Sequence, residues 1–140
     1  MENGVPTHRE IIWANCCTEG KEIGNRKGIP PHMFVVLTKK PYNETSSHFS
    51  ALPITSKKEG KHQQYILDYG INITQDDVDG RISNFTFDKD SFILCDRPSR
   101  IDKKDLSINQ AHTSRVRDGF FENLTSEIFM FFRRGRINRR

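Results

Sequence analysis

The chain has 140 residues, of which 34% are hydrophobic, and its net charge is +4 at pH 7. This length indicates a single domain, and the mean hydropathy of −0.69 indicates a largely polar surface. No apolar run approaches the ~18 residues that span a bilayer, and the N-terminal residues lack the apolar core of a signal peptide, so we expect no membrane segment.

The charge and the cysteines suggest where the protein acts. A net positive charge suits a polyanionic partner such as a nucleic acid. The three cysteines, Cys16, Cys17 and Cys95, form neither a disulfide framework nor a zinc-ligand spacing. We therefore expect a cytoplasmic protein that carries no metal and no other cofactor.

Short strands dominate the first half of the chain. Residues 10–17 are a strand candidate, and residues 18–32, rich in Gly, Pro and charge, have the character of a long exposed loop that often carries function. Residues 33–40 are β-branched and apolar, which predicts a strand buried on both faces. A turn over 41–47 then leads to a strand over 48–55.

The middle of the chain continues the pattern. A charged loop over 56–63 precedes a predicted strand over 64–70, and residues 71–82 indicate an irregular polar excursion. Residues 83–87 predict a short strand, and the continuous apolar run in residues 91–96 is a clear signal for another strand.

The last element has a helical period. Its apolar residues recur at spacings of four, four and three: Phe120, Leu124, Ile128 and Phe131. Five arginines follow within residues 133–140, which we expect to be a disordered basic tail behind a domain that covers residues 1–132.

The order of these elements predicts a mainly β fold. Short strands separated by turns and followed by one helix are typical of a small, partly open antiparallel barrel. A parallel βαβ sheet is disfavoured, because no helical period lies between the predicted strands.

The segment 92–102 raises a question of chemistry. Its first three residues are apolar and run directly into Cys95-Asp96-Arg97-Pro98. In one interpretation the strand simply exits into a charged turn, where Asp96 pairs with Arg97 or Arg100. In the other, the rim of the barrel presents an acid and a cation to a bound molecule. The residues alone leave both interpretations open.

Three segments, in order, resemble the MazF/PemK/Kid family of toxins from toxin–antitoxin systems. Residues 10–17 are similar to the opening strand of the family, and residues 34–56 to the hairpin that ends in Pro-x-Thr-Ser. Residues 95–102 are similar to the Cys-Asp-Gln-Pro-Arg-Thr-Ile-Asp pattern of the Kid branch. The resemblance implies an SH3-like barrel, a homodimer, and sequence-selective, metal-independent cleavage of single-stranded RNA such as mRNA. It also implies a cognate antitoxin that occupies the RNA groove.

The family arginines are the main departures. His32 stands where the family has an arginine before its second strand, and Arg26 in the preceding loop is the candidate for a displaced arginine. In the Kid branch a second arginine precedes Cys-Asp. Here that place is Leu94, and Arg97 is the nearest substitute.

RNA breaks when its 2′-oxygen attacks the adjacent phosphorus, which leaves a 2′,3′-cyclic phosphate and a 5′-hydroxyl. The enzyme supplies a base, an acid and donors to the phosphoryl oxygens. The resemblance assigns Asp96 as the base or as the group that orients it, and Thr55 as a hydroxyl donor. His32 or Arg26 is the candidate partner in proton transfer.

Further cations and hydroxyls are candidates for RNA contacts, because they lie in predicted loops or at strand ends where phosphates can approach. Each has an alternative interpretation as an ordinary solvated loop or turn residue. The candidates are Arg97, Arg100, Lys27, Ser56, Lys57 and Lys58.

Two rival functions remain at this point. One is a non-catalytic binder on the same barrel, either an inactive relative that binds RNA or a CcdB-like inhibitor of gyrase. The other is a general interaction module with a basic surface. The arginine departures favour a binder, while Thr55 and Asp96 favour the enzyme, and fold alone does not separate them.

Overall fold

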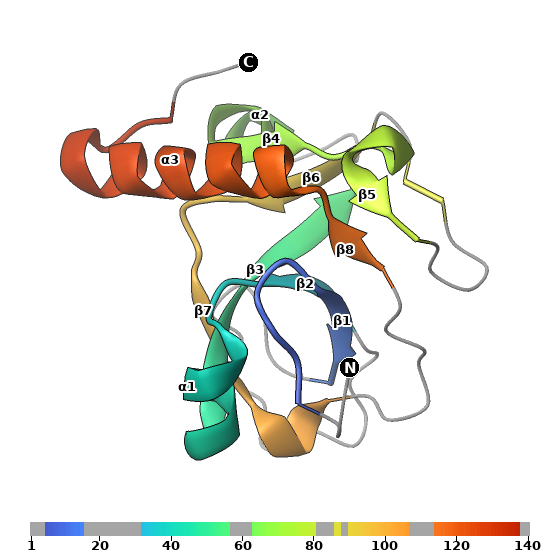
Figure 1. Ribbon diagram of the computed structural model, residues 1–140. Helices are drawn as coiled ribbons and strands as arrows, with labels where there is room; N and C mark the ends of the chain where they lie inside the picture. Colours follow the sequence, from blue (N-terminus) through green and yellow to red (C-terminus); the bar gives the residue numbers. More distant parts are fainter. Residues whose placement is uncertain are drawn as a thin grey trace.

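The structure is a computed structural model that describes residues 5–15, 32–56, 63–80, 86–87, 90–106 and 114–137. Within these ranges the chain forms short strands and three α-helices (Figure 1). In chain order the elements are β1 (Ile11–Ala14), β2 (His32–Val36), α1 (Lys40–Thr45), β3 (His48–Ser56), α2 (Gln63–Tyr69), β4 (Gly70–Asn72), the 3-10 turn η2 (Gln75–Asp77), β5 (Val78–Asp79), β6 (Ser91–Leu94), β7 (Ser99–Asp102), the 3-10 turn η3 (Lys103–Asp105), β8 (Arg115–Val116) and α3 (Asp118–Arg134).

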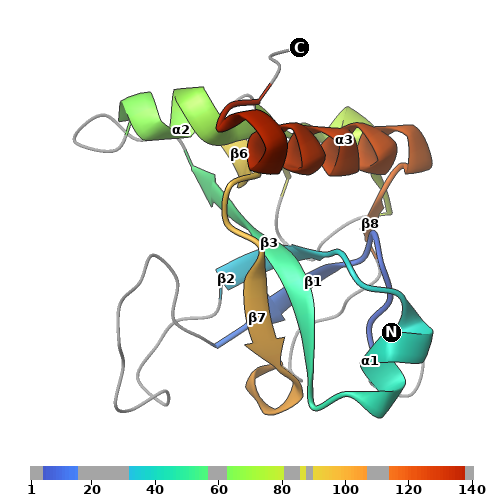
Figure 2. The same cartoon turned by 90° about the vertical axis from the view of Figure 1, so that its left-hand side faces the viewer.

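Strand β3 is the common partner in the main sheet. The sheet runs in the order β1-β2-β3-β6-β4, with β7 also paired to β3, and every pairing is antiparallel. Ala51 of β3 is opposite both Val36 of β2 and Ser99 of β7, and residues 54–56 further along pair with β6. Figure 2 shows β3 running from α1 at one end of the molecule to α2 and β6 at the other.

The sheet is buried on both faces, as predicted for the apolar run in residues 33–40. Met33 and Val35 of β2 point into one hydrophobic cluster, while Phe34 and Val36 point into another. This division follows from the two-residue period of a strand. All four side chains are buried, which confirms a buried strand over residues 33–36. The rest of the predicted strand is wrong, because β2 ends at Val36 and Lys40 already lies in α1.

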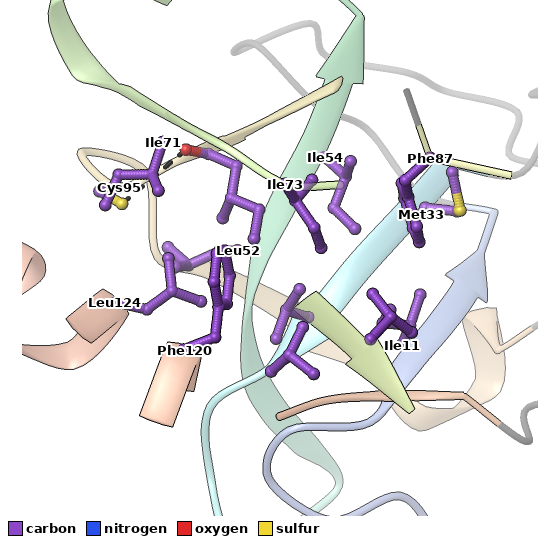
Figure 3. Close-up of a cluster of buried hydrophobic side chains, with 14 of the residues drawn as sticks. Ile11, Met33, Leu52, Ile54, Ile71, Ile73, Phe87, Cys95, Phe120 and Leu124 are labelled. Carbon is purple, nitrogen blue, oxygen red and sulfur yellow. Dashed lines mark hydrogen bonds between the residues drawn. The ribbon is translucent and has the colours of Figure 1, made fainter. Parts of the chain in front are cut away.

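Helix α3 covers the larger of these clusters. Phe120 and Leu124 project from α3 toward Leu52 of β3 and Ile71 of β4 (Figure 3). A separate two-stranded ladder, β5 with β8, leads into the start of α3. The predicted mainly β barrel with a C-terminal helix is therefore confirmed, and its sheet is not closed.

The predicted strand over 64–70 is wrong, because this segment forms helix α2 and only its last residue lies in β4. Its polar and aromatic side chains sit one helical turn apart. Gln64 Nε2 donates to Asp68 Oδ1 at 2.9 Å, and the rings of Tyr65 and Tyr69 lie 5.1 Å apart. These (i, i+4) contacts form on a helix and not on a strand.

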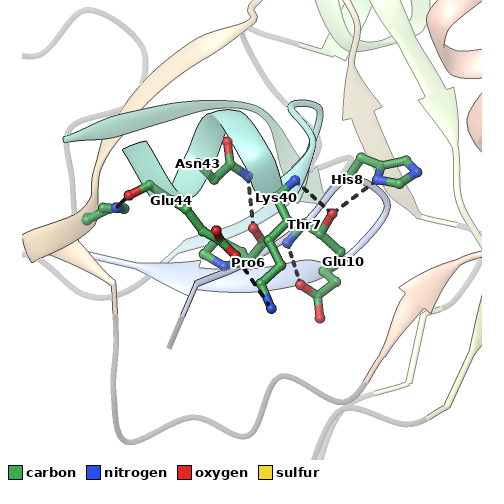
Figure 4. A network of polar contacts seen from close by, with 8 residues as sticks. Pro6, Thr7, His8, Glu10, Lys40, Asn43 and Glu44 are labelled. Carbon is green, nitrogen blue, oxygen red and sulfur yellow. Dashed lines mark hydrogen bonds and ion pairs between the residues drawn. The ribbon is translucent and has the colours of Figure 1, made fainter. Parts of the chain in front are cut away.

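The predicted turn over 41–47 contains most of helix α1. Pro41 occupies the first turn, where its missing N–H is tolerated. Asn43 anchors the helix from within: its Nδ2 donates to the carbonyls of Pro6 and Thr38 at 2.8 Å each, and its Oδ1 accepts from Thr38 Oγ1 at 2.7 Å. Figure 4 shows Asn43 and Lys40 of α1 beside Pro6 and Thr7.

The C-terminal helix agrees with its prediction and extends slightly beyond it. Helix α3 runs to Arg134, and Gly135 caps it with a φ of 72° and an N–H that donates to the Phe131 carbonyl at 2.7 Å. Ile137 is buried in the larger cluster. The boundary between a domain over 1–132 and a basic tail stays a prediction.

The polar excursion predicted over 71–82 is partly regular. Its described residues include the rest of β4, the turn η2 and β5. Most of the short strand predicted over 83–87 lies outside the described residues, as does the long loop predicted over 18–32 apart from His32.

Candidate active site

The corner between β6 and β7 carries the central acid. Strand β6 ends at Leu94, Cys95 and Asp96 form a turn, and β7 begins at Ser99. The backbone N–H of Cys95 donates to the Tyr69 carbonyl at 3.1 Å, which ties the corner to the end of α2. Pro98 follows without a donor of its own. The chain therefore leaves the buried sheet at this point and places Asp96 at the edge of the core.

The two carboxylate oxygens of Asp96 have different surroundings. The Tyr65 hydroxyl donates a hydrogen bond to Oδ2. Oδ1 is buried, and in the part of the chain that the structure describes it has no hydrogen-bond partner. The side chain as a whole is 11% exposed. A buried acceptor without a donor is rare in proteins and is often found at functional positions.

Arg97 lies next to this carboxylate. Its Nε is 4.0 Å from Asp96 Oδ2 and donates to the Tyr65 hydroxyl oxygen at 2.7 Å. Its guanidinium carbon lies 4.7 Å from the centre of the Tyr65 ring, in a cation–π contact. Among the described residues no acceptor bonds its terminal nitrogens, and the side chain is 32% exposed. Those nitrogens are available to a phosphate.

The electrostatics of the corner make Asp96 a stronger base than an ordinary aspartate. Burial raises the pKa of the Asp96 carboxyl, while the Arg97 guanidinium and the backbone N–H of Asp96 act in the opposite direction. Burial is the largest of these effects. The carboxyl thus titrates closer to neutral pH, which suits proton transfer.

Tyr65 is the site residue that sequence reasoning missed. It lies on α2, a segment predicted as a strand, and 31 residues separate it from Asp96. The (i, i+4) spacing of Gln64 with Asp68, and of Tyr65 with Tyr69, was the available signal for the helix. Nothing in the sequence pairs this tyrosine with the Cys-Asp corner.

Thr55 and Ser56 lie at the end of β3, away from the corner. Thr55 is opposite Phe92 and Ser56 is opposite Ser91 on β6. Phe92 precedes Asp96 by four residues, and β6 ends between them at Leu94, so the ladder pairs Thr55 with a position before the turn that carries the acid. The structure brings Asp96 and Arg97 together, and among the described residues no hydrogen bond joins Thr55 to either of them.

His32 and Arg100 occupy exposed positions elsewhere on the sheet. His32 begins β2, and the ladder with β3 stops at Phe34, two residues away. The Arg100 Nε donates to Asp102 Oδ1 at 3.3 Å. Arg100 also lines a surface pocket of about 470 Å³ together with Ser47, Asp102, Lys103 and Lys104.

Four of the predicted site residues lie outside the described residues. These are Arg26, Lys27, Lys57 and Lys58. Within the described ranges no cluster of three or more His, Cys, Asp or Glu side chains is arranged to hold a metal ion. No helix in these ranges has the length and apolar character needed to cross a bilayer.

An open antiparallel barrel with a C-terminal helix defines a fold class of small, mainly β proteins. The chain belongs to one family of this class: the model for the PemK-like, MazF-like toxin of type II toxin–antitoxin systems matches residues 7–131. The resemblance read from the three sequence segments is thereby confirmed. A search of the curated proteins finds no match.

Solved structures share this fold at low sequence identity. A MazE–MazF complex from Deinococcus radiodurans matches with a TM-score of 0.60 and 14% identity, over 91% of this chain and 96% of that chain. MazF alone from the same organism matches with a TM-score of 0.58 and 13% identity, over 91% and 96%. An endoribonuclease in complex with its cognate antitoxin from a mycobacterial species matches with a TM-score of 0.52 and 10% identity, over 93% and 92%.

Proposed function

We propose that this protein is a sequence-selective, metal-independent endoribonuclease toxin that cleaves single-stranded RNA. The observation that carries the proposal is the corner at Asp96, where a buried carboxylate with one unfilled oxygen lies beside a guanidinium. Membership of the toxin family and the endoribonuclease among its structural neighbours support the same reaction class.

In the proposed reaction the RNA attacks itself. Asp96 removes the proton from a ribose 2′-hydroxyl, and the 2′-oxygen forms a bond to the adjacent phosphorus. The bond from phosphorus to the 5′-oxygen breaks, and that oxygen takes a proton from an acid. The products are a 2′,3′-cyclic phosphate and a 5′-hydroxyl end. A base or acid in such a step contributes about 10²–10⁴-fold.

The other roles follow from position. Arg97 binds the phosphoryl oxygens of the reacting phosphate through its terminal nitrogens. Thr55 lies opposite Phe92, four residues before Asp96 in the chain, so we assign its hydroxyl to a neighbouring nucleotide. His32 or Arg26 is the acid. Arg100 and the pocket beside it bind a phosphate further along the strand.

The same proposal includes partners. The solved MazF relative is complexed with MazE, and the mycobacterial enzyme with its cognate antitoxin, which supports an antitoxin partner for this chain as well. Phe129 and Phe132 of α3 are 58% and 66% exposed, respectively. Such aromatic exposure supports a protein contact on this helix, and we assign it to a homodimer. A toxin acting on mRNA works in the cytoplasm.

One observation favours a non-catalytic binder as the second candidate. Both oxygens of Asp96 are covered, Oδ1 by burial and Oδ2 by Tyr65, and the family arginine before Cys-Asp is replaced by the buried Leu94. A barrel of this kind can bind RNA or another protein without cutting anything.

The deciding experiment incubates the purified protein with single-stranded RNA in excess chelator and maps the cut ends. Cyclic phosphate ends, together with an intact DNA copy of the same sequence, are expected, because DNA lacks the attacking 2′-oxygen. Tight binding that leaves the RNA intact would identify the binder instead. Cut DNA, or RNA ends with a 5′-phosphate, would overturn the proposed chemistry.

A further inference from the structure

Tyr65 joins the acid and the cation of the corner. Its hydroxyl donates to Asp96 Oδ2 and accepts from Arg97 Nε at 2.7 Å. The Arg97 guanidinium carbon also lies 4.7 Å from the centre of the same ring. One phenol therefore contacts both residues, through its hydroxyl and through its face.

Tyr65 is itself held in place from behind. The Tyr69 ring lies 5.1 Å from the Tyr65 ring and 5.8 Å from the ring of Phe131 on α3. The Tyr69 carbonyl accepts the backbone N–H of Cys95, the residue directly before Asp96. Gly70 allows this close approach, since a Cβ there would lie 2.5 Å from the Ile66 carbonyl oxygen and 3.1 Å from Phe92 Cβ. The Tyr65 ring therefore packs against a residue that is itself tied to both α3 and the turn before Asp96.

This arrangement distinguishes the two oxygens of the acid. Oδ2 is already taken by the phenol, whereas Oδ1 has no donor among the described residues. We propose that Tyr65 is a positioning residue for RNA cleavage: through its contacts to Asp96 Oδ2 and Arg97 Nε it holds the carboxylate in the orientation needed for proton transfer, and it turns the terminal nitrogens of Arg97 toward the phosphate. This inference rests on the proposed function and deepens it.

The groups around the carboxylate determine how the inference can be tested. From its own turn, Asp96 faces Arg97, and from α2 it faces the Tyr65 hydroxyl. In the described ranges Arg97 is the charged group that acts on its titration. The phenol donates to the ionised carboxylate, so removing the phenolic O–H should make Asp96 harder to ionise.

The first test needs no RNA. Aspartate labelled with ¹³C at the carboxyl carbon is titrated by NMR in the wild type, in Tyr65→Phe and in Tyr69→Phe, with Asp96→Asn used to assign the signal. In Tyr65→Phe the midpoint of the Asp96 titration is expected at higher pH than in the wild type. Tyr69→Phe is the matched control, because it removes a hydroxyl from the same helix, and its midpoint should not move. An unmoved midpoint in Tyr65→Phe overturns the inference.

The second test follows RNA cleavage against pH for the same proteins. Tyr65→Phe should cleave about 10-fold or more slowly at mildly acidic pH, because a hydrogen bond to a charged group has been lost. The acid limb of its profile should move to higher pH, and the deficit should shrink as the pH rises. A purely structural lesion would instead lower the rate equally at every pH, and that result would also overturn the inference.

The two tests separate this inference from the proposed function. If the wild type cleaves no RNA, the endoribonuclease assignment fails, and the NMR titration still decides whether Tyr65 controls the acid. If the wild type cleaves RNA and the NMR midpoint is the same in Tyr65→Phe, the endoribonuclease stands and the role of Tyr65 is rejected. A Tyr65→Phe protein with a wild-type rate profile likewise rejects it.

Discussion

Asn43 in α1 is buried and Asp96 at the β6–β7 corner is largely buried, and the hydrogen bonding of these two polar side chains is very different. Each hydrogen-bonding atom of the Asn43 side chain has a partner, at distances of 2.7 and 2.8 Å to Thr38 and of 2.8 Å to Pro6. Asp96 has one oxygen bonded to Tyr65 and one that is buried with no partner among the described residues.

The difference separates a structural network from a site. A buried polar group that is fully paired adds rigidity and stability, whereas an unpaired one is costly to keep. At Asp96 one buried oxygen is unpaired among the described residues, which lowers the stability of the fold. At Asn43 each side-chain polar atom is paired. A position that is unfavourable for stability and still carries a charged residue is where a ligand is expected to supply the missing contact.

The largest expected effect is on chemistry at Asp96. Asp96→Asn should lower the RNA cleavage rate by about 10²–10⁴-fold, because the amide cannot accept the ribose proton, and should leave RNA affinity nearly unchanged. Cleavage and filter-binding assays measure the two quantities. Asp68→Asn, the same substitution on the exposed side of α2, is the control and should retain the wild-type rate. A fully active Asp96→Asn protein would remove this residue from the mechanism.

The next largest effect is on the stability of the fold, through the hydrogen bonds of Asn43. Asn43→Ala should lower the free energy of unfolding by about 3 kcal/mol, because it removes the side-chain bonds and leaves buried carbonyls unpaired. Urea denaturation measures the change. The neighbouring Glu44→Ala should change stability by about 0.5 kcal/mol or less, since Glu44 is exposed and its ion pair with Lys40 spans 3.8 Å. Similar losses for both variants would mean that the Asn43 network contributes little.

A smaller effect is expected from the exposed Arg100. Arg100→Ala should weaken RNA binding modestly and reduce the slope of log affinity against log salt by about 0.7, the value for one contact to a single-stranded phosphate. Binding measured from low to high salt gives the slope. Arg115 is an exposed arginine on β8 with no assigned role, and Arg115→Ala should keep the wild-type slope. Equal slopes for all three proteins would place RNA away from the pocket beside Arg100.

The smallest effect concerns the pH dependence of stability. Burial raises the pKa of the Asp96 carboxyl in the folded protein above its ordinary value, so the folded state holds the proton more tightly than the unfolded state does. The ionised carboxyl therefore destabilises the fold at neutral pH, and this penalty disappears as the pH falls toward the unfolded value. Asp96→Asn should be more stable than the wild type at pH 7.

Measuring the stability of both proteins over a range of pH checks the direction of the pKa shift of Asp96. In urea denaturation at pH 7, 6, 5 and 4, the stability advantage of Asp96→Asn over the wild type should shrink steadily with acidification. Other acidic groups titrate in both proteins and cancel in the difference. An advantage that grows at low pH would mean that burial does not dominate the titration of Asp96.

The sequence predicted the apolar parts of the strands with a continuous apolar pattern, namely residues 33–36 of the predicted 33–40 and residues 91–94 of the predicted 91–96, and the helix whose period begins at Phe120. It also predicted that Asp96 and Arg97 would stand at a strand end. These features are local, so a window of a few residues contains the signal.

What the sequence did not predict depends on contacts between distant segments. Tyr65 and Asp96 meet across 31 residues, and no local period reports that contact. Residues 64–70 carry a short apolar run, and such a run is ambiguous between strand and helix. In the helix that forms, Tyr69 packs against Phe131 of α3, a contact that the local sequence does not report. The offset between Thr55 and Asp96 came from the ladder register, which motif matching cannot supply.

The central position of β3 has a consequence for the order in which the fold is completed during synthesis. β3 pairs with β2 before it in sequence and with β6 and β7 after it. A growing polypeptide that stops short of residue 91 has neither the acid nor the strand that completes the pairing of residues 54–56. Non-local pairing of this kind forms slowly, so residues 54–56 wait for their β6 partner until about two thirds of the chain exists.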